Sequence, residues 1–292
     1  MAQTWKENGP IVIGGIGGSG TRLVADICRT TGIFLGQDLN RALDNLYFTL
    51  LFRRYRWYEK NRHNPAAIKR GLRLLKKMIL QDRRLSLPES IFLGNAVLDY
   101  FLHYRKVERT WSFDRLRRYF SSERPQDNYQ AWGWKEPNTY LILPELAEVF
   151  PNLKFIHTIR HGLDMAFSSN QRQMKNWGNL FFDDQSPSSD NSPAQSLKFW
   201  IAANQLAAEQ GKRLGPERYL RVSFDKLCTE PEPILREILE FLGREVDPGT
   251  FTELLGLPHA PESLGRYQSH DLSIFNKEDL DRVRMLGFRV DL

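Results

Sequence analysis

A glycine-rich stretch near the amino terminus has the composition of an anion-binding loop. It follows the short apolar run Ile11–Ile13, and apolar residues then recur at helical spacing, so it is expected to join a buried strand to a helix. Glycines bring backbone N–H groups close to a ligand, and a helix start adds partial positive charge. The sequence therefore predicts an anion site at this loop. Its residues are Gly17, Gly18, Ser19, Gly20, Thr21 and Arg22.

Two common nucleotide-binding patterns fit the loop in part. Gly15 and Gly20 have the spacing of the phosphate loop of nucleoside triphosphatases, but the next two residues are not its lysine and its magnesium-binding hydroxyl. The stretch also matches the dinucleotide pattern G-x-G-x-x-G, and Asp38 follows near the distance expected of a ribose-binding acid. The following strand, expected at Ile33–Leu35, is very short for that fold. An NAD(P)-dependent oxidoreductase is the main competing enzyme class.

A second cationic position follows the clearest strand pattern in the chain. The apolar stretch Leu153–Ile159 predicts a buried strand, Arg160 comes directly after it, and Ser168 lies eight residues further on in a predicted helix. Ligands bind at the carboxyl ends of parallel strands. An arginine there can donate two hydrogen bonds to a phosphate, and a serine hydroxyl can add a third. From these residues alone, a surface arginine and a helical serine without a shared ligand fit equally well.

The two sites together resemble those of the sulfotransferase family. Its members have a strand and a Ser-Gly-Thr loop for the 5′-phosphosulfate of the donor. They also have a later strand ending in Arg, with Asp at +4 and Ser at +8, for the 3′-phosphate. The resemblance runs from about Ile11 to Leu242 and implies 3′-phosphoadenylyl sulfate as donor, adenosine 3′,5′-bisphosphate as product, and no metal. The matching residues are Ser19, Gly20, Thr21, Arg160, Asp164 and Ser168.

The resemblance extends to three further cations. A Lys-x-Pro element precedes the later strand of the family, and its presence here implies that Lys135 covers the oxygen that leaves the donor. Many relatives have a cation just before Ser-Gly-Thr, where this chain has glycines, so Arg22 is expected to supply that charge. The stretch Ser263–Tyr267 resembles the segment that closes over the donor, which would bring Arg266 to the 3′-phosphate. A linker before the last helix is the alternative for this stretch.

The catalytic base is expected among the acidic residues that follow the helix of the loop. Relatives use a histidine or an acidic residue to deprotonate the acceptor. Asp38 is the first candidate and Asp44 the second, because both lie where the acceptor could enter. Asp38 would instead contact a ribose in an oxidoreductase. His157 has apolar neighbours on its predicted strand and is expected to be a core residue.

Positive charge is concentrated in one segment. The chain has 41 Lys and Arg against 35 Asp and Glu, a net charge of +6. Between Arg53 and Arg84 there are 12 basic and 2 acidic residues, a local excess of +10. This segment belongs to a mainly helical insertion predicted at about 41–130. It fits an acidic acceptor, a membrane surface, another subunit, or simply solvated helix faces, and so local an excess does not favour nucleic acid as a partner.

Strand and helix patterns alternate on both sides of the insertion. This predicts an α/β fold with three αβα layers around a central parallel sheet, with the topology of phosphate-loop nucleotide hydrolases. The whole chain, 1–292, is expected to form one domain. The stretch Asp183–Pro193, rich in Asp, Ser and Pro, is expected to be a flexible loop that acts as a lid.

Composition restricts the remaining possibilities. Cys28 and Cys228 lie far apart without metal-ligand spacing, so neither a disulfide framework nor a zinc site is expected. No run approaches the ~18 apolar residues of a membrane span, and a cytoplasmic location is expected. The sequence thus predicts a sulfotransferase that modifies a hydroxyl or amine of a glycan, a lipid or a small molecule. A sulfotransferase-like binding module without turnover is the non-enzymatic alternative.

Overall fold

The computed structural model describes residues 5–126, 128–182 and 192–290. Five strands form one parallel sheet flanked by helices, in the order β2-β3-β1-β4-β5. The predicted α/β fold with phosphate-loop topology is therefore confirmed. In the dinucleotide-binding fold β1 lies beside β2, whereas here β1 lies between β3 and β4. The strands are β1 (Ile11–Gly15), β2 (Ile33–Phe34), β3 (Ala131–Lys135), β4 (Lys154–Ile159) and β5 (Tyr219–Ser223).

The chain divides into two compact units. Unit 1 comprises Met1–Val12 and Gly32–Lys154, and unit 2 comprises Ile13–Thr31 and Phe155–Leu292. The predicted lid, Asp183–Pro193, lies almost entirely outside the described residues. None of the helices that the structure describes is both long enough and apolar enough to cross a membrane.

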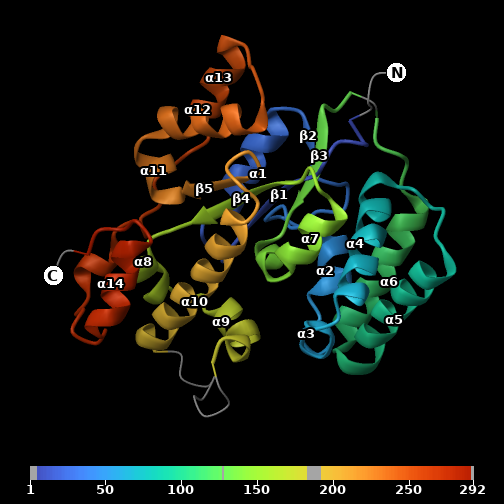
Figure 1. Ribbon diagram of the computed structural model, residues 1–292, viewed down its shortest axis with the longest axis horizontal. Helices are drawn as coiled ribbons and strands as arrows, with labels where there is room; N and C mark the ends of the chain where they lie inside the picture. The colour runs from blue at the N-terminus through green and yellow to red at the C-terminus, as the bar shows by residue number, and fades with distance from the viewer. Residues whose placement is uncertain (1–4, 127, 183–191, 291–292) are drawn as a thin grey trace. The chain divides into compact units, whose positions relative to one another are not determined.

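Unit 1 contains the pair β2–β3 and a cluster of helices in which α2, α4, α5 and α6 lie side by side (Figure 1). Its core is aromatic: Trp132 and Trp134 on β3 are buried, and both meet the ring of Phe150 edge-on. Asn64 caps α4, and Pro65 is its first residue. The helices are α2 (Leu46–Phe52), α3 (Tyr55–Asn61), α4 (Pro65–Leu80), α5 (Leu87–His103), α6 (Lys106–Ser121), η1 (Pro137–Ile142) and α7 (Leu143–Val149).

Unit 2 contains the pair β4–β5, with Phe155 opposite Tyr219 and Ile159 opposite Ser223. Helix α10 packs against α8 and α14, so the last helix of the chain joins the core of this unit (Figure 1). The helices are α1 (Thr21–Thr30), α8 (Gly162–Ala166), α9 (Arg172–Trp177), η2 (Gly178–Leu180), α10 (Pro193–Lys212), α11 (Phe224–Thr229), α12 (Pro231–Leu242), α13 (Pro248–Leu255), η3 (Arg266–Ser269) and α14 (Lys277–Met285).

The turn from β1 into α1 depends on glycine at two positions. Gly15 and Gly20 have φ values of 141° and 89°, which side chains rarely adopt. A Cβ on Gly15 would lie 2.3 Å from the carbonyl oxygen of Thr158, and one on Gly20 would lie 2.0 Å from the ring of Phe224. The close approach of β4 and of the first residue of α11 therefore fixes the loop conformation.

His157 on β4 is a core residue, as predicted. Its side chain is fully buried, and its ring nitrogens are each 3.0 Å from a partner, Nδ1 from the Tyr219 hydroxyl and Nε2 from the Asn204 side-chain oxygen. Because the Asn204 oxygen can only accept, Nε2 carries the proton and Nδ1 accepts from Tyr219. Burial lowers the pKa of His157 from 6.5 to about 4, which leaves a neutral ring in the folded protein.

Replacing His157 by Gln should flatten the acid limb of the stability curve. Between pH 6.5 and 4 the unfolded chain binds a proton at His157 that the folded chain refuses, so wild-type stability falls as the pH falls through this window. The loss is at most about 3 kcal/mol. Urea denaturation at several pH values measures the free energy of unfolding. Wild type and variant are compared by the slope of this free energy against pH, because the variant also loses hydrogen bonds and is less stable at every pH. Equal slopes for wild type and variant would contradict the assignment.

Replacing Gly20 by Ala should destabilise unit 2 more than replacing Gly215 by Ala. Both glycines have positive φ, 89° and 84°, but a Cβ on Gly215 meets nothing within 4 Å. Gly215→Ala therefore measures backbone strain alone, about 1–2 kcal/mol, while Gly20→Ala also displaces Phe224. Urea denaturation of both variants tests this, and equal losses would show that the Phe224 contact is dispensable.

Candidate functional site

The loop after β1 presents polar groups at the amino end of α1. Ser19 is only 2% exposed, and its Oγ has no hydrogen-bond partner among the described residues. Leaving a buried hydroxyl unpaired costs about 1–3 kcal/mol, so this oxygen fits a ligand atom. Thr21 is buried in the first turn of α1, whereas the side chain of Arg22 is exposed. The loop thus combines backbone N–H groups, a buried hydroxyl and an adjacent exposed cation.

One loop N–H already has a side-chain partner. The Gly17 nitrogen donates to Oε1 of Gln173 on α9 at 2.7 Å. The carboxamide oxygen is an uncharged acceptor on a backbone N–H of the glycine loop. Gln173 was not predicted from the sequence, because a glutamine in an irregular polar stretch matches no pattern.

Arg160 follows the end of β4 and is half-buried. Its Nη2 donates to the carbonyl and the hydroxyl of Ser263, each at 2.8 Å, while its Nε has no hydrogen-bond partner among the described residues. Its guanidinium lies over the ring of Phe224 at 5.2 Å. Burial lowers its pKa, and the positive charge of Arg266 lowers it further, although Asp164 and Asp225 oppose this. An anion bound here would offset both effects.

The carboxylate of Asp164 connects the carboxy-terminal segment to α8. It accepts hydrogen bonds from the backbone N–H groups of Gly265 at 2.7 Å and Tyr267 at 3.1 Å. Arg266 lies between these two residues, and its Nη1 donates to the carbonyl of Phe167 at 3.4 Å, one residue before Ser168. Two predicted site residues, Arg160 and Arg266, therefore lie near each other in unit 2, since the charge of Arg266 acts on Arg160. The hydroxyl of the third, Ser168, accepts from the backbone N–H of Asn170 at 3.2 Å.

Phe224 lies between the loop and the arginine cluster. Its ring packs against Gly20 on one side and beneath the guanidinium of Arg160 on the other. A second contact has the same effect, because the methyl group of Met165 on α8 would lie 3.3 Å from a Cβ on Gly18. The two anion-binding elements predicted from distant parts of the sequence are therefore neighbours within one unit. The role of Phe224 was not predicted from the sequence.

In unit 1, Lys135 and Asp44 form a buried ion pair. Lys135 ends β3 and is 3% exposed, and its Nζ lies 2.5 Å from Oδ1 of Asp44 and donates to the carbonyl of Ala42 at 3.1 Å. The other carboxylate oxygen of Asp44 accepts from the side chain of Asn40 at 2.8 Å. Two of the three predicted catalytic residues are therefore in contact, and each holds the other in place.

The third, Asp38, has different partners. Its carboxylate is buried beside two arginines of α6, with Arg115 Nε at 2.8 Å and Arg118 Nε at 3.8 Å. The contact with Arg115 is an ion pair without hydrogen-bond alignment, since neither atom has a hydrogen-bond partner among the described residues. Burial raises the pKa of Asp38, and the two arginines lower it. Asp38 thus holds α6 against the segment after β2.

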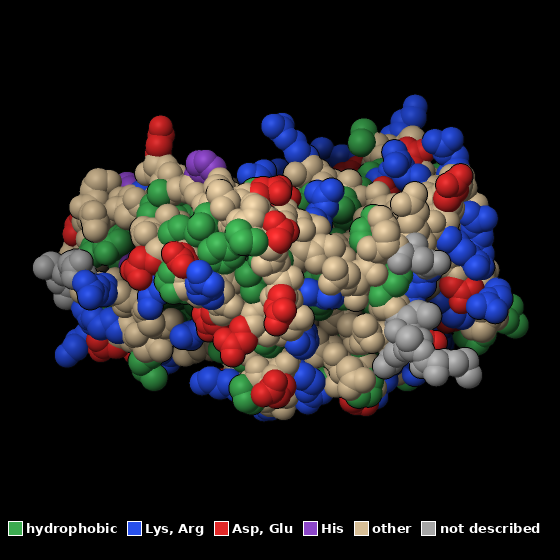
Figure 2. Space-filling model, turned by 90° about the horizontal axis from the view of Figure 1, so that it is seen from above, with side chains coloured by type: hydrophobic (Ala, Val, Ile, Leu, Met, Phe, Trp, Pro, Cys, Tyr) green, Lys and Arg blue, Asp and Glu red, His purple; other side chains and the backbone are tan. Residues whose placement is uncertain are grey.

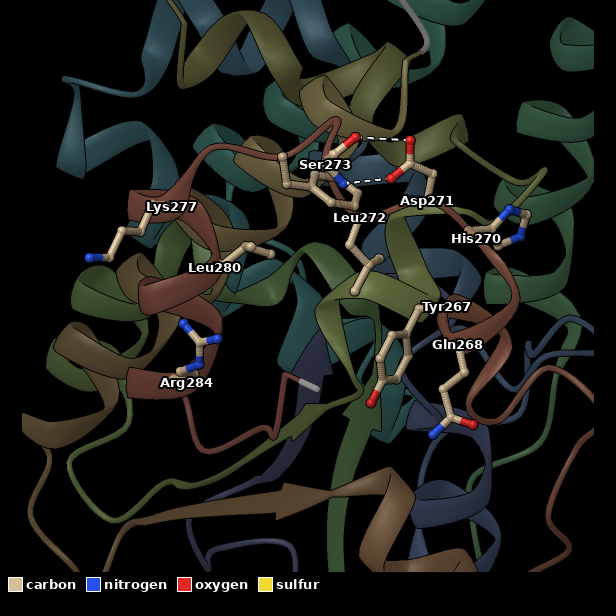
Figure 3. Close-up of a pocket in the computed structure, with 10 residues that line it drawn as sticks. Tyr267, Gln268, His270, Asp271, Leu272, Ser273, Lys277, Leu280 and Arg284 are labelled. Carbon is tan, nitrogen blue, oxygen red and sulfur yellow. Dashed lines mark hydrogen bonds between the residues drawn. The ribbon is translucent and has the colours of Figure 1, made fainter. Parts of the chain in front are cut away.

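A pocket of about 950 Å³ lies in unit 2 beside the carboxy-terminal segment. Figure 3 shows Lys277, Leu280 and Arg284 of α14 on one side of it, across from Tyr267 and Gln268 of η3. Asp271 is held by two hydrogen bonds from Ser273, and Arg284 pairs with Asp281. Because the pocket shares only Tyr267 with the segment that Asp164 binds, we give it no part in the site.

Solved structures with the same fold are sulfotransferase domains. The sulfotransferase domain from the Synechococcus PCC 7002 olefin synthase matches 100% of this chain and 98% of its own length, with a TM-score of 0.52 at 16% identity. The sulfotransferase domain from the curacin biosynthetic pathway matches 97% of this chain and 99% of its own, with a TM-score of 0.50 at 16% identity. At this identity the likeness concerns the fold alone.

Similarity in sequence points the same way. Over 108 residues, 37% of this chain, it is 31% identical to a protein-tyrosine sulfotransferase of Drosophila melanogaster and 32% identical to protein-tyrosine sulfotransferase A of Caenorhabditis elegans. These stretches are only 20% and 26% of the two relatives. Residues 10–248, by contrast, match the family model over both the loop and the arginine that follows β4. The chain therefore belongs to the sulfotransferase family.

Proposed function

We propose that this protein transfers a sulfuryl group from 3′-phosphoadenylyl sulfate to a hydroxyl or amine of an acceptor. The observation that carries the proposal is the contact of Phe224 with both Gly20 and Arg160, which joins two anion-binding elements within one unit. A nucleotide with anionic groups at both its 5′ and 3′ ends matches such a pair. A nucleotide charged only at its 5′ side would leave the arginine cluster without a ligand.

The unpaired polar atoms fit this donor. Ser19 Oγ is buried in the loop, and Arg160 Nε is buried at the end of β4, and both have hydrogen-bonding capacity left over. In the proposed complex Ser19, Thr21 and the loop N–H groups hold the 5′-phosphosulfate. Arg160, Ser168 and Arg266 hold the 3′-phosphate. Because Gly17 N–H already donates to Gln173, that carboxamide gives way when the loop takes up the anion.

When bound, the donor supplies a sulfuryl group whose leaving group is the 5′-phosphate of the nucleotide. The protein has to hold sulfur in line with the acceptor atom and to stabilise the charge that develops on the bridging oxygen. The amino end of α1 provides fixed partial positive charge at the loop, and the exposed side chain of Arg22 adds a cation in the first turn of the helix. The helix end is in place before the reaction, so it needs little reorganisation during the transfer.

We assign the leaving oxygen to Lys135 on the strength of the family resemblance. The burial of Lys135 supports this, because a desolvated ammonium stabilises developing negative charge more than a hydrated one does. The carboxylate of Asp44 offsets part of that charge. Asp44 fixes the ammonium, and Asn40 in turn fixes Asp44.

We propose Asp38 as the first candidate for the catalytic base and Asp44 as the second. The raised pKa of Asp38 brings it closer to the operating pH of a general base, although its arginine partners favour the ionised form. Asp44 is engaged by Lys135 and Asn40. The pH dependence of kcat/KM distinguishes them, because Asn at the position of the base removes the acid limb of the profile while Asn at the other position leaves it.

The acceptor is best sought first among phenolic hydroxyls. The fly and nematode relatives are named protein-tyrosine sulfotransferases, and their identity to this chain over 108 residues favours a tyrosine-containing peptide as the first acceptor to test. Glycans, lipids and small molecules complete the panel. Donor binding without sulfation of any acceptor in the panel would favour the binding module over the enzyme.

Replacing Arg160 by Ala should lower the affinity for adenosine 3′,5′-bisphosphate about 10- to 100-fold, because a charge-assisted pair with the 3′-phosphate is lost. The affinity for adenosine 5′-phosphate, which lacks that group, should change little. Calorimetric titration of both ligands into the variant measures the difference, with Arg213→Ala, an exposed arginine at the end of α10, as the matched control.

Equal weakening of the two nucleotides would remove Arg160 from the 3′ site. Thermal shifts of the wild type with the bisphosphate, ATP and NAD give an independent check, since a ligand at about 100 times its Kd adds about 2.7 kcal/mol. Stabilisation by NAD alone would overturn the proposal.

Replacing Lys135 by Met should lower kcat by about 10²-fold or more while leaving bisphosphate affinity nearly unchanged, because the ammonium acts on charge that exists only in the transition state. The variant also leaves the carboxylate of Asp44 without its cationic partner. The double variant Lys135→Met/Asp44→Asn removes both charges and controls for this. Restored turnover in the double variant would show that Lys135 serves only to neutralise Asp44.

A further inference from the structure

Two neighbouring helices of unit 1 present an apolar face to solvent. On α5 the exposed large side chains are Leu87, Ile91, Leu98, Phe101 and Leu102, with Leu87 75% exposed. Their spacing of three and four residues places them along one side of the helix. Gly94, in the middle of this row, has nothing within 4 Å of a Cβ position, so the row is open there too.

Helix α6 extends the same surface. Val107, Phe113 and Phe120 are exposed, Val107 by 78%. The rings of Phe101 and Phe113 meet edge-on at 6.4 Å, so exposed apolar side chains of the two helices are in contact at this point. We call these eight side chains the α5–α6 face. Of the ten large apolar side chains exposed among the described residues, eight belong to it, whereas isolated exposed apolar residues are normal.

The charges around this face are mostly positive. Between residues 83 and 124 the exposed charged side chains are seven basic ones and a single acidic one, Glu123. Lys106 and Arg117 lie on α6 itself, and neither forms an ion pair in the described structure. Prominent Lys and Arg side chains, with acidic ones between them, are visible at the right-hand end of Figure 2, the end that carries these helices in Figure 1. The basic side chains are Arg83, Arg84, Arg105, Lys106, Arg117, Arg118 and Arg124.

This charge decides between two occupants of the face. We call these seven basic side chains the rim of the α5–α6 face. A second copy of the chain would bring one basic rim against another, and like charges at close range oppose association. An anionic lipid surface offers the opposite sign to the rim and a hydrocarbon boundary to the apolar side chains. That combination characterises helices that lie in a membrane interface without crossing it.

We propose that the α5–α6 face binds the surface of an anionic membrane. Leucine and phenylalanine side chains enter the boundary between headgroups and acyl chains, while Lys106 and Arg117 contact lipid phosphates. The aliphatic parts of basic side chains add to the apolar contact with the membrane, since the guanidinium of Arg109 already lies over the ring of Phe101 at 5.1 Å. The proposal is independent of sulfuryl transfer, because no residue of the α5–α6 face or its rim belongs to the site described above except Arg118, which pairs with Asp38.

Co-sedimentation of the full chain with vesicles tests it. The probes are phosphatidylcholine vesicles with and without about 30% phosphatidylserine, an anionic lipid. Binding is expected only with phosphatidylserine and should weaken as salt rises. Leu98→Gln/Leu102→Gln and Lys106→Glu/Arg117→Glu should each weaken it at least about tenfold. Because all four side chains are exposed, circular dichroism should stay unchanged.

The matched control is Arg62→Glu/Arg70→Glu, which reverses two exposed charges of the same unit that lie at the end of α3 and on α4 rather than on α5 or α6. It should bind like the wild type. Wild-type chain that stays in the supernatant, or equal loss in the control and the α6 variant, would overturn the proposal. So would a wild-type dimer in light scattering that the Leu98→Gln/Leu102→Gln variant converts to a monomer, since a second copy would then cover the α5–α6 face.

Discussion

The buried carboxylate of Asp164 is the interaction on which the candidate donor site depends. Its two oxygens accept the backbone N–H groups of Gly265 and Tyr267, residues about a hundred positions further along the chain. Without this anchor the segment would not bring Ser263 to Arg160 or Arg266 to the carbonyl before Ser168. Both carboxylate oxygens of Asp164 thus accept hydrogen bonds from the backbone. Its Oδ2 also lies 4.0 Å from Nη2 of Arg160, the long end of an ion-pair distance.

Features that depend on neighbouring residues could be predicted from the sequence, and features that depend on distant residues could not. The positions of the loop and of Arg160 were predictable because a strand end, a run of glycines and a helix start are recognised from adjacent residues. Asp38 shows the limit: its burial comes from Arg115 on α6, and no periodicity in the sequence pairs two residues so far apart. Phe224 and Gln173 were missed for the same reason, since each acts through a loop distant in sequence.

Cations of the helical insertion fall into two groups that composition cannot separate. In the strongly basic stretch, Arg54 is buried against Asp99, Lys69 pairs with Glu148, and Lys77 pairs with Glu89 at 2.7 Å. Three charges of that excess are therefore offset by acids contributed from other elements.

The unpaired cations that flank exposed apolar side chains lie later, on α6, in a region whose net charge is smaller. What makes a surface attractive to an anionic partner is the accessible charge that lacks a counter-ion, because a paired cation has already given up most of its field. Lys106 and Arg117 meet that condition, and Lys69 and Lys77 do not. Exposed cations without an ion pair in the described structure also occur in the +10 stretch, Arg62 and Arg70 among them. What distinguishes Lys106 and Arg117 is their place on a helix that also exposes large apolar side chains, and this combination is the reason for proposing the α5–α6 face.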